Sequence, residues 1–367
     1  MFTIFIIQER NMTHLKAGIT IGKNFSKRIA SFLLAGLLFM CILSGCGKDV
    51  RESEIQQLSK KYSVPEEKQL VICTSHKEEV YLPIIREFEV RTGIWVEIRT
   101  GGTAEMMDRI ESELENGEYD IMFGGGAESY EARKELFVPY SSSENKELNQ
   151  AYLSKENLWT PFTELPIVFV YNPKLVSVTD APKSWHDLFL NKWKGLIAFA
   201  DMEVSGTSYT IISTMEQLFS EEPESLIPRF YEQLNGSILQ SSGDILPSVE
   251  SGKFLVGITL EETAKKYIES GHDIAMIYPS DGTCAIPDAC AIVKNAPHSY
   301  NAGKFIDFIV SRDTQKFAME EFHRRPVRTD IDLMKEYGRI DLMDFDIRKS
   351  AAKEKEAMGI WHEITKR

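Results

Sequence analysis

Apolar and polar residues alternate along most of the chain in a way that predicts short strands followed by helices. Apolar runs of strand length occupy residues 69–74, 94–99, 120–123, 165–171, 196–200, 254–260, 273–278 and 289–293. Apolar residues at helical spacing follow several of these runs, as with Val80, Ile84, Ile85 and Phe88. This alternation predicts an α/β protein in which parallel strands carry helices on both faces.

Small and hydroxyl-bearing residues follow four of the predicted strands, where helices begin. Because ligands of parallel sheets bind beyond the carboxyl ends of the strands, we expect these loops to meet at one cleft. The best candidate is Ser205-Gly206-Thr207-Ser208, whose helix start would offer N–H groups to an anion. The same residues would also suit an ordinary N-cap. The other loops contribute Thr74, Ser75, His76, Gly102, Thr103, Gly125 and Gly126.

Two acidic residues farther along the chain, Asp244 in a polar loop and Glu261 at the end of a predicted strand, are candidates for the other end of a ligand. Asp244 and Glu261 could accept hydrogen bonds from hydroxyl groups or hold an amine, although acidic residues more often lie on the solvated surface. An enzyme would need a nucleophile with a base. Ser75 and His76 lie side by side, and sequence neighbours rarely form such a pair. No nucleotide motif or zinc spacing is present, so no cofactor and no metal are expected.

The first 45 residues form a basic and then apolar segment that is typical of export signals. Leu43-Ser44-Gly45-Cys46 resembles the lipobox of bacterial lipoproteins, which implies cleavage before Cys46 and a lipid on that residue. An uncleaved membrane anchor is the alternative, and Met12 is a plausible start. Residues 46–69 are charged and aperiodic, and we expect them to tether the folded part to the membrane.

The net charge of the chain limits the binding partners to be expected, and its cysteines suggest where a disulfide could form. The chain carries a net charge of −13, and removing residues 1–45, which hold five basic residues and one acidic residue, leaves −17. This charge argues against nucleic acid and against an anionic membrane surface. Cys284 and Cys290 flank a short segment and could form a disulfide outside the cytoplasm, whereas Cys73 is expected to be a buried thiol.

Several long stretches resemble type 2 solute-binding proteins of ABC importers. The likeness begins with EVYLPIIREFEVRTGIWVEIRTGGTAEMMDRI and YDIMFGGGAE, and continues through PKSWHDLFLNKWKGLIAFADMEVSGTSYT, FLVGITLEETAKKYIESG and RRPVRTDI. The resemblance implies two α/β lobes, each a mostly parallel sheet flanked by helices, joined by two crossover strands around a ligand cleft. Lobe 1 would hold residues 70–166 and 283–367, and lobe 2 residues 167–282.

The similar branch includes binders of ferric iron, hexose phosphates, aminoethylphosphonate and phosphoglycerate. Iron binders of this branch place two tyrosines where this chain has Glu261-Glu262, so the departure argues against iron, which remains the alternative. The donor-rich loops favour a small organic phosphate or phosphonate. The resemblance further implies a monomeric, lipid-anchored, extracytoplasmic protein that delivers its ligand to an ABC permease. An enzyme or a ligand sensor built on the same cleft is the alternative of another class.

Overall fold

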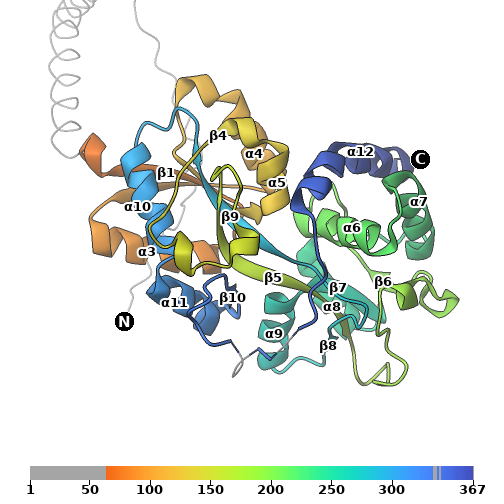
Figure 1. Cartoon of the computed structure of the whole chain (residues 1–367). Helices are drawn as coiled ribbons and strands as arrows, with labels where there is room; N and C mark the ends of the chain where they lie inside the picture. Colours follow the sequence, from red (N-terminus) through yellow and green to blue (C-terminus); the bar gives the residue numbers. More distant parts are fainter. Residues whose placement is uncertain (1–62, 334–336, 339, 367) are drawn as a thin grey trace, which may run out of the picture. The chain divides into compact units, whose positions relative to one another are not determined.

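The N-terminal part of the fold follows the predicted strand–helix order (Figure 1). The computed structural model describes residues 63–333, 337–338 and 340–366, within one compact unit from Val64 to Arg367. β1 (Gln69–Thr74) leads to α3 (Glu78–Thr92), β2 (Trp95–Thr100) to α4 (Thr103–Ser112), and β3 (Ile121–Gly126) to α5 (Ala127–Ala132). The three strands are parallel in the order β2-β1-β3, so their carboxyl ends lie at one edge.

The helix α3 shows how local pattern fixes these elements. Its apolar positions Val80, Ile84 and Phe88 are buried, and Gly93 ends it with the left-handed φ of 67° that glycine tolerates. Pro83 lies inside the helix, which begins earlier, at Glu78. The proline therefore does not mark the start of this helix.

Two long strands join the two lobes. The first half of β5 (Thr160–Tyr171) pairs with β9 (Ala285–Val293) and β10 (Arg325–Pro326), and its second half pairs with β7 (Val256–Leu260) and β8 (Ala275–Ile277). Both strands start earlier than predicted and contain prolines. The β5–β9 register shifts between Pro161 and Glu164, an irregularity of the kind that tolerates proline.

The sheets are mixed rather than mostly parallel. Among the strands of the described residues, parallel pairs are β1–β2, β1–β3 and β6 (Ile197–Ala198) with β7. The crossover strands β5 and β9 run antiparallel to their neighbours β3, β4 (Phe137–Val138), β7, β8 and β10. The sheets differ from the predicted, mostly parallel ones because a strand that passes from one lobe to the other cannot follow the βαβ repeat within either lobe.

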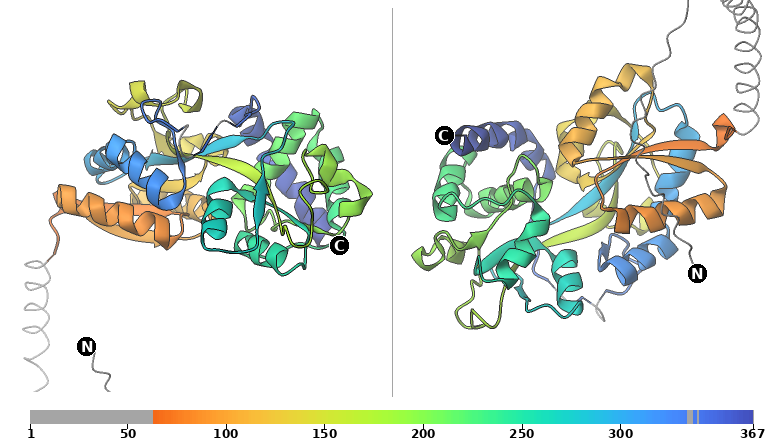
Figure 2. Two further views of the ribbon diagram at one scale, coloured as in Figure 1. Left: turned by 90° about the horizontal axis from the view of Figure 1, so that it is seen from below. Right: turned by 180° about the vertical axis from the view of Figure 1, so that it is seen from behind.

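Helices cover both lobes, and the C-terminal helix contacts both of them (Figure 2). The second lobe carries α6 (Gly206–Phe219), α7 (Pro223–Leu234), α8 (Ile245–Glu250) and α9 (Glu261–Glu269), and the chain then returns to the first lobe with α10 (Ser299–Ile309) and α11 (Arg312–Phe322). Short 3-10 helices occupy Glu66–Lys68, Leu114–Asn116, Lys134–Leu136, Asn145–Glu147, Gln150–Tyr152, His186–Phe189, Asn191–Trp193 and Ser242–Asp244.

The helix α12 (Ile347–Thr365) packs against α5 of the first lobe and against α6 and α7 of the second. Its Trp361 is fully buried and donates from Nε1 to Asp201 Oδ1 at 2.8 Å, and its Ser350 carbonyl accepts from the Tyr209 hydroxyl. The tail after residue 283 therefore does not stay with the first lobe alone. The largest apolar cluster reflects this, because it includes Tyr130, Phe230 and Trp361 together.

The prediction that Cys284 and Cys290 could form a disulfide is wrong. Both residues are buried free thiols, and Cys284 directly precedes the strand β9 that contains Cys290. Six residues of extended strand span about 20 Å, whereas a disulfide needs Cα atoms about 4.4–6.8 Å apart. Cys73 is also a buried free thiol, as predicted. Among the described residues, no helix is both long and apolar enough to cross a membrane.

Candidate functional site

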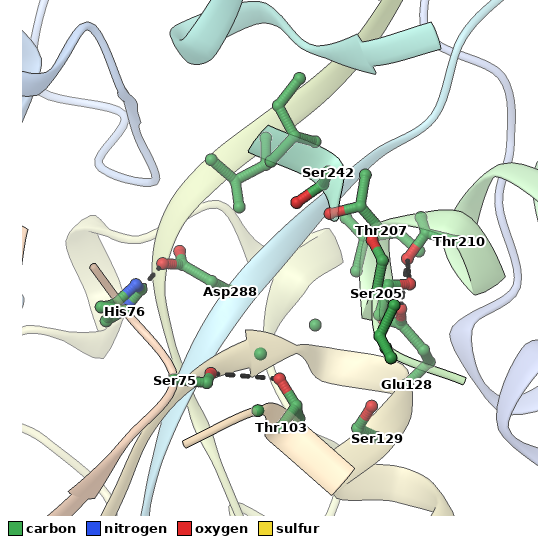
Figure 3. Close-up of a pocket in the computed structure, with 18 of the residues that line it drawn as sticks. Ser75, His76, Thr103, Glu128, Ser129, Ser205, Thr207, Thr210, Ser242 and Asp288 are labelled. Atoms are coloured by element: carbon green, nitrogen blue, oxygen red, sulfur yellow. Dashed lines mark hydrogen bonds and ion pairs between the residues drawn. The ribbon is translucent and has the colours of Figure 1, made fainter. Parts of the chain in front are cut away.

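A cavity of about 230 Å³ lies between the carboxyl ends of the first-lobe strands and the start of α6 (Figure 3). Residues from both lobes line it. Nine of the thirteen predicted ligand-binding residues are among them: Ser75, His76, Gly102, Thr103, Gly125, Gly126, Ser205, Gly206 and Thr207. Two adjoining hollows share part of this lining, so the cavity is the middle of a longer cleft.

The first-lobe wall consists of three loops packed closely on one another. Thr103 Oγ1 at the start of α4 donates to Ser75 Oγ, which follows β1, at 3.1 Å. Gly125 has a φ of 87°, and a Cβ atom there would lie 2.5 Å from Thr103 Cγ2. Glycine is therefore required at 125 by both its backbone angle and this contact.

The second-lobe wall is the N-terminus of α6. Ser205 is the N-cap residue, but its side chain makes no capping hydrogen bond, so the ordinary N-cap role is not filled by its hydroxyl. The Ser208 N–H donates to the Ser205 carbonyl at 3.0 Å. The N–H groups before it are of the kind that lack an acceptor within a helix, and together with the helix dipole they favour an anion. Gly206 faces the first lobe, since a Cβ atom there would lie 4.0 Å from Thr103 Oγ1.

Arg324 is a wall residue that the sequence did not single out. Its guanidinium is buried and donates from Nη1 to Asp288 Oδ2 at 2.7 Å and to Thr163 Oγ1 at 3.2 Å. Asp288 Oδ1 accepts two further bonds, from the Thr163 backbone N–H at 2.7 Å and from its hydroxyl at 2.6 Å. Asp288 is thus saturated, whereas Arg324 Nε is buried without a hydrogen-bond partner among the described residues.

His76 lies beside this pair as a neutral ring. Its Nε2 is 3.2 Å from Asp288 Oδ2 without hydrogen-bond alignment, and the ring packs edge-on to Phe123. Burial and the nearby positive charge of Arg324 lower the pKa of His76 well below its usual value. The imidazole is therefore uncharged at neutral pH, and it adds a polar wall atom rather than a second positive charge.

Glu128 lines the cavity beside the start of α6 and was also missed (Figure 3). It lies in the first turn of α5 and is 2% exposed, and its Oε1 accepts from Thr210 Oγ1 of α6 at 2.6 Å. This bond joins the first lobe to the second. Its Oε2 has no hydrogen-bond partner in the described part of the chain. Burial raises the pKa of Glu128 to about 7.

Four predicted residues lie outside the cavity. Thr74 is buried behind it and accepts from the His76 backbone N–H at 3.1 Å, while Ser208 lines only an adjoining hollow. Asp244 is exposed, and Ser242 of the same 3-10 helix faces the cavity in its place. Glu261 is buried and bound by Arg325, with Nε–Oε2 at 2.7 Å and Nη2–Oε1 at 3.0 Å.

The arrangement of the side chains around the cavity is suited to binding a ligand. The Ser75 hydroxyl accepts from Thr103, and His76 lies against Asp288 instead of Ser75, so these neighbours do not form a nucleophile–base pair. Within the described residues, no group of three or more His, Cys, Asp or Glu side chains is placed to hold a metal ion. What converges on the cavity is a set of donors at one part of its wall and a carboxylate at another.

Several proteins with similar sequences are named as binding proteins. A Sinorhizobium fredii protein named as an ABC transporter periplasmic-binding protein is 26% identical over 252 residues, covering 66% of this chain and 70% of the relative. A Salmonella typhi protein whose name assigns it 2-aminoethylphosphonate binding is 24% identical over 250 residues, covering 66% of this chain and 73% of the relative.

Solved structures show the same architecture. The periplasmic binding protein AfuA from Actinobacillus pleuropneumoniae, with fructose-6-phosphate bound, matches with a TM-score of 0.72 and 25% identity over 81% of this chain and 98% of its own. A ferric binding protein from Campylobacter jejuni matches with a TM-score of 0.73 and 22% identity, over 80% and 99% of the two chains. The predicted two-lobed binding-protein fold is therefore confirmed.

The family assignment comes from a sequence match that covers more than half of the chain. Residues 117–337, from before β3 to beyond β10, match the model of the bacterial extracellular solute-binding proteins. This range includes α6 and both crossover strands, and thus much of the cavity described above. The chain belongs to this family of extracellular solute-binding proteins, as its two lobes, its donor-lined cleft and its relatives among ABC importer components together indicate.

Proposed function

We propose that the protein captures a small organic phosphate or phosphonate in the interlobe cavity and delivers it to an ABC permease. The observation that carries this proposal is Arg324 Nε, a buried positive donor without a partner among the described residues, on the wall that also includes the start of α6. A guanidinium and a helix N-terminus are both groups that bind phosphoryl oxygens.

The remaining donors of the cavity point to the same ligand class. Ser75, Thr103, Ser205, Thr207 and Ser242 add hydroxyl groups from both lobes. Hydroxyl groups can donate as well as accept, so together with Arg324 and the start of α6 they suit a ligand with several acceptor atoms, as phosphate and phosphonate groups have. The relatives that are named for 2-aminoethylphosphonate binding or solved with fructose-6-phosphate support this class.

Ferric iron is the less favourable ligand. The two acidic residues at the position of the iron branch's tyrosines are engaged by arginines: Glu261 by Arg325, and Glu262 by Arg324 with Nη2–Oε1 at 3.7 Å. A trivalent cation needs several anionic oxygens and would lie here beside the buried guanidinium of Arg324. The names of some relatives assign them iron, including iron uptake protein A1 of Synechocystis.

The remaining parts of the proposal rest on sequence. Cys46, the residue expected to carry a lipid, lies outside the described residues. We infer a monomeric binding protein without enzymatic activity, held outside the cytoplasm by this anchor. Such a protein would release its ligand to the permease when the lobes open about β5 and β9.

The proposal is tested first by a thermal-shift screen with sugar phosphates, phosphonates, phosphoglycerates, spermidine and ferric citrate. Calorimetry with the best ligand then compares the wild type with Thr207→Val, which removes one hydroxyl at the start of α6. Losing one charge-assisted hydrogen bond, worth about 1.5–3 kcal/mol, should weaken binding about tenfold to a hundredfold. Thr179→Val, in an exposed loop of the second lobe, is the matched control and should leave affinity unchanged. An uncharged best ligand, or full affinity in Thr207→Val, would contradict this assignment.

A further inference from the structure

Glu128 differs from the other acidic residue on the cavity wall in having an unused oxygen. Asp288 has both oxygens occupied, by Thr163 and Arg324. Glu128 uses Oε1 for Thr210, whereas Oε2 is buried and lacks a partner among the described residues. A buried acceptor without a donor is costly, so native proteins rarely retain one unless a ligand or water satisfies it.

Glu128 also has no ion-pair partner among the described residues. The groups that interact electrostatically with it include Glu354 of α12, Tyr209 of α6 and Cys284 next to β9, and none of these three is cationic. Glu354 is itself acidic and further disfavours a negative charge on Glu128. Within the described part of the chain, Oε2 therefore has neither a hydrogen-bond donor nor a paired cation.

We propose that Glu128 binds an ammonium group of the ligand, so that the cavity selects phosphonates or phosphate esters that carry a primary amine. This inference rests on the proposed function, because Arg324 and the start of α6 would hold the anionic end of the same molecule. An ammonium supplies a donor and a positive charge together, whereas a hydroxyl supplies only the donor. Glu128 would thereby take the role that the sequence suggested for Asp244 and Glu261.

The hydrogen bond to Thr210 fixes the geometry of this recognition. Thr210 lies on α6, the helix whose start forms the proposed anion site, and it holds the carboxylate of Glu128 across the interface between the lobes. Closure of the lobes would therefore set the position of the ammonium acceptor relative to the anion donors.

Calorimetry with three matched probes tests the proposal: 2-aminoethylphosphonate, 2-hydroxyethylphosphonate and ethylphosphonate. The wild type should bind the amino probe about tenfold to a hundredfold more tightly than ethylphosphonate, and more tightly than the hydroxyl probe. Glu128→Gln keeps the shape and an oxygen for Thr210, and it should abolish this preference. Glu135→Gln, an exposed carboxylate just beyond α5, should keep the wild-type preference.

Proton release gives a second measurement that a merely structural role would not change. Because the pKa of Glu128 is raised to about 7, roughly half a proton should leave it near pH 7 when an ammonium binds, and this release is measurable in buffers of different ionisation enthalpy. Glu128→Gln should abolish this release. Equal binding of the three probes, a hydroxyl preference as large as the amine preference, or unchanged discrimination in Glu128→Gln would overturn the ammonium site alone. If no phosphonate or phosphate ester binds the wild type, the proposed function fails and this inference with it.

Discussion

The buried ion pair between Glu261 and Arg325 should stabilise the fold without contributing to ligand affinity. Glu261 opens α9 of the second lobe, and Arg325 lies in β10, which pairs with the first half of β5. Their side chains are 1% and 4% exposed, and two hydrogen bonds of 2.7 Å and 3.0 Å join them. The Tyr278 hydroxyl also donates to Glu261. Removing the acid would therefore leave a buried guanidinium without its main partner.

The loss of unfolding free energy expected in Glu261→Ala can be estimated from this geometry. Removing one partner of a buried ion pair costs about 3–5 kcal/mol, and Glu261→Ala should show a loss of that size. Unfolding entropy is about 2.1 cal/mol/K per residue, which for the unit from Val64 to Arg367 gives about 0.6 kcal/mol/K. The melting temperature should therefore fall by about 5–8 °C. Glu261→Gln should fall less, because the amide oxygen can still accept from Arg325.

Differential scanning calorimetry measures this fall, and titration with the best ligand measures affinity in the same variants. Glu269→Gln, an exposed acid at the end of α9, is the matched control and should melt within about 1 °C of the wild type. The double variant Glu261→Gln with Arg325→Met should recover part of the loss, because no lone buried charge remains. A wild-type melting temperature in Glu261→Ala would refute the stability argument. A large loss of affinity with unchanged stability would show instead that Glu261 contacts the ligand.

Three further predictions concern other parts of the chain. Burial raises the pKa of Glu216 from 4.5 to about 7, so the native state loses stability as pH rises through this range. With allowance for solvent screening, Glu216→Gln should be more stable than the wild type by about 2 kcal/mol at pH 8 and by almost nothing at pH 4.5. Urea unfolding at the two pH values measures this difference. A difference that does not change with pH would contradict this. Cys46→Ala should abolish incorporation of labelled fatty acid and release the protein from membranes, and retained label would disprove the anchor. The purified protein mixed with ferric iron should show no tyrosinate–iron absorption band, since such a band with tight binding would favour the iron alternative.

The strand–loop–helix order could be predicted because its signals are local. Apolar spacing identified α3, and the small residues after β1, β2 and β3 identified the cleft edge, since carboxyl ends of parallel strands meet there. Whether each polar residue faces the cavity was harder to predict. Asp244 and Ser242 belong to one 3-10 helix, yet only Ser242 lines the cavity. A difference of two residues changes direction in such a helix, and the sequence does not show which side is buried.

The antiparallel crossover strands could not be predicted from local pattern for a related reason. The stretch that became β9 contains Pro287 and Asp288, and only its last residues form an uninterrupted apolar run. Its full length is set by pairing with β3 on one side and β5 on the other. These partners lie far away in the sequence, so the strand boundaries, and with them the impossibility of the disulfide, depend on tertiary contacts.

The charged residues that define the proposed site were missed because charge partners are a property of the folded chain. Arg324 and Arg325 are adjacent and look equivalent in sequence. At the start of β10 they point to opposite sides, as successive residues of extended chain do, so Arg324 meets Asp288 and Arg325 meets Glu261. Arg325 is fixed by Glu261 in a bidentate ion pair, while Arg324 keeps its Nε without a partner among the described residues. A ligand anion would thus bind Arg324, the neighbour whose donor on the cavity wall is unsatisfied, whereas Arg325 holds β10 against α9.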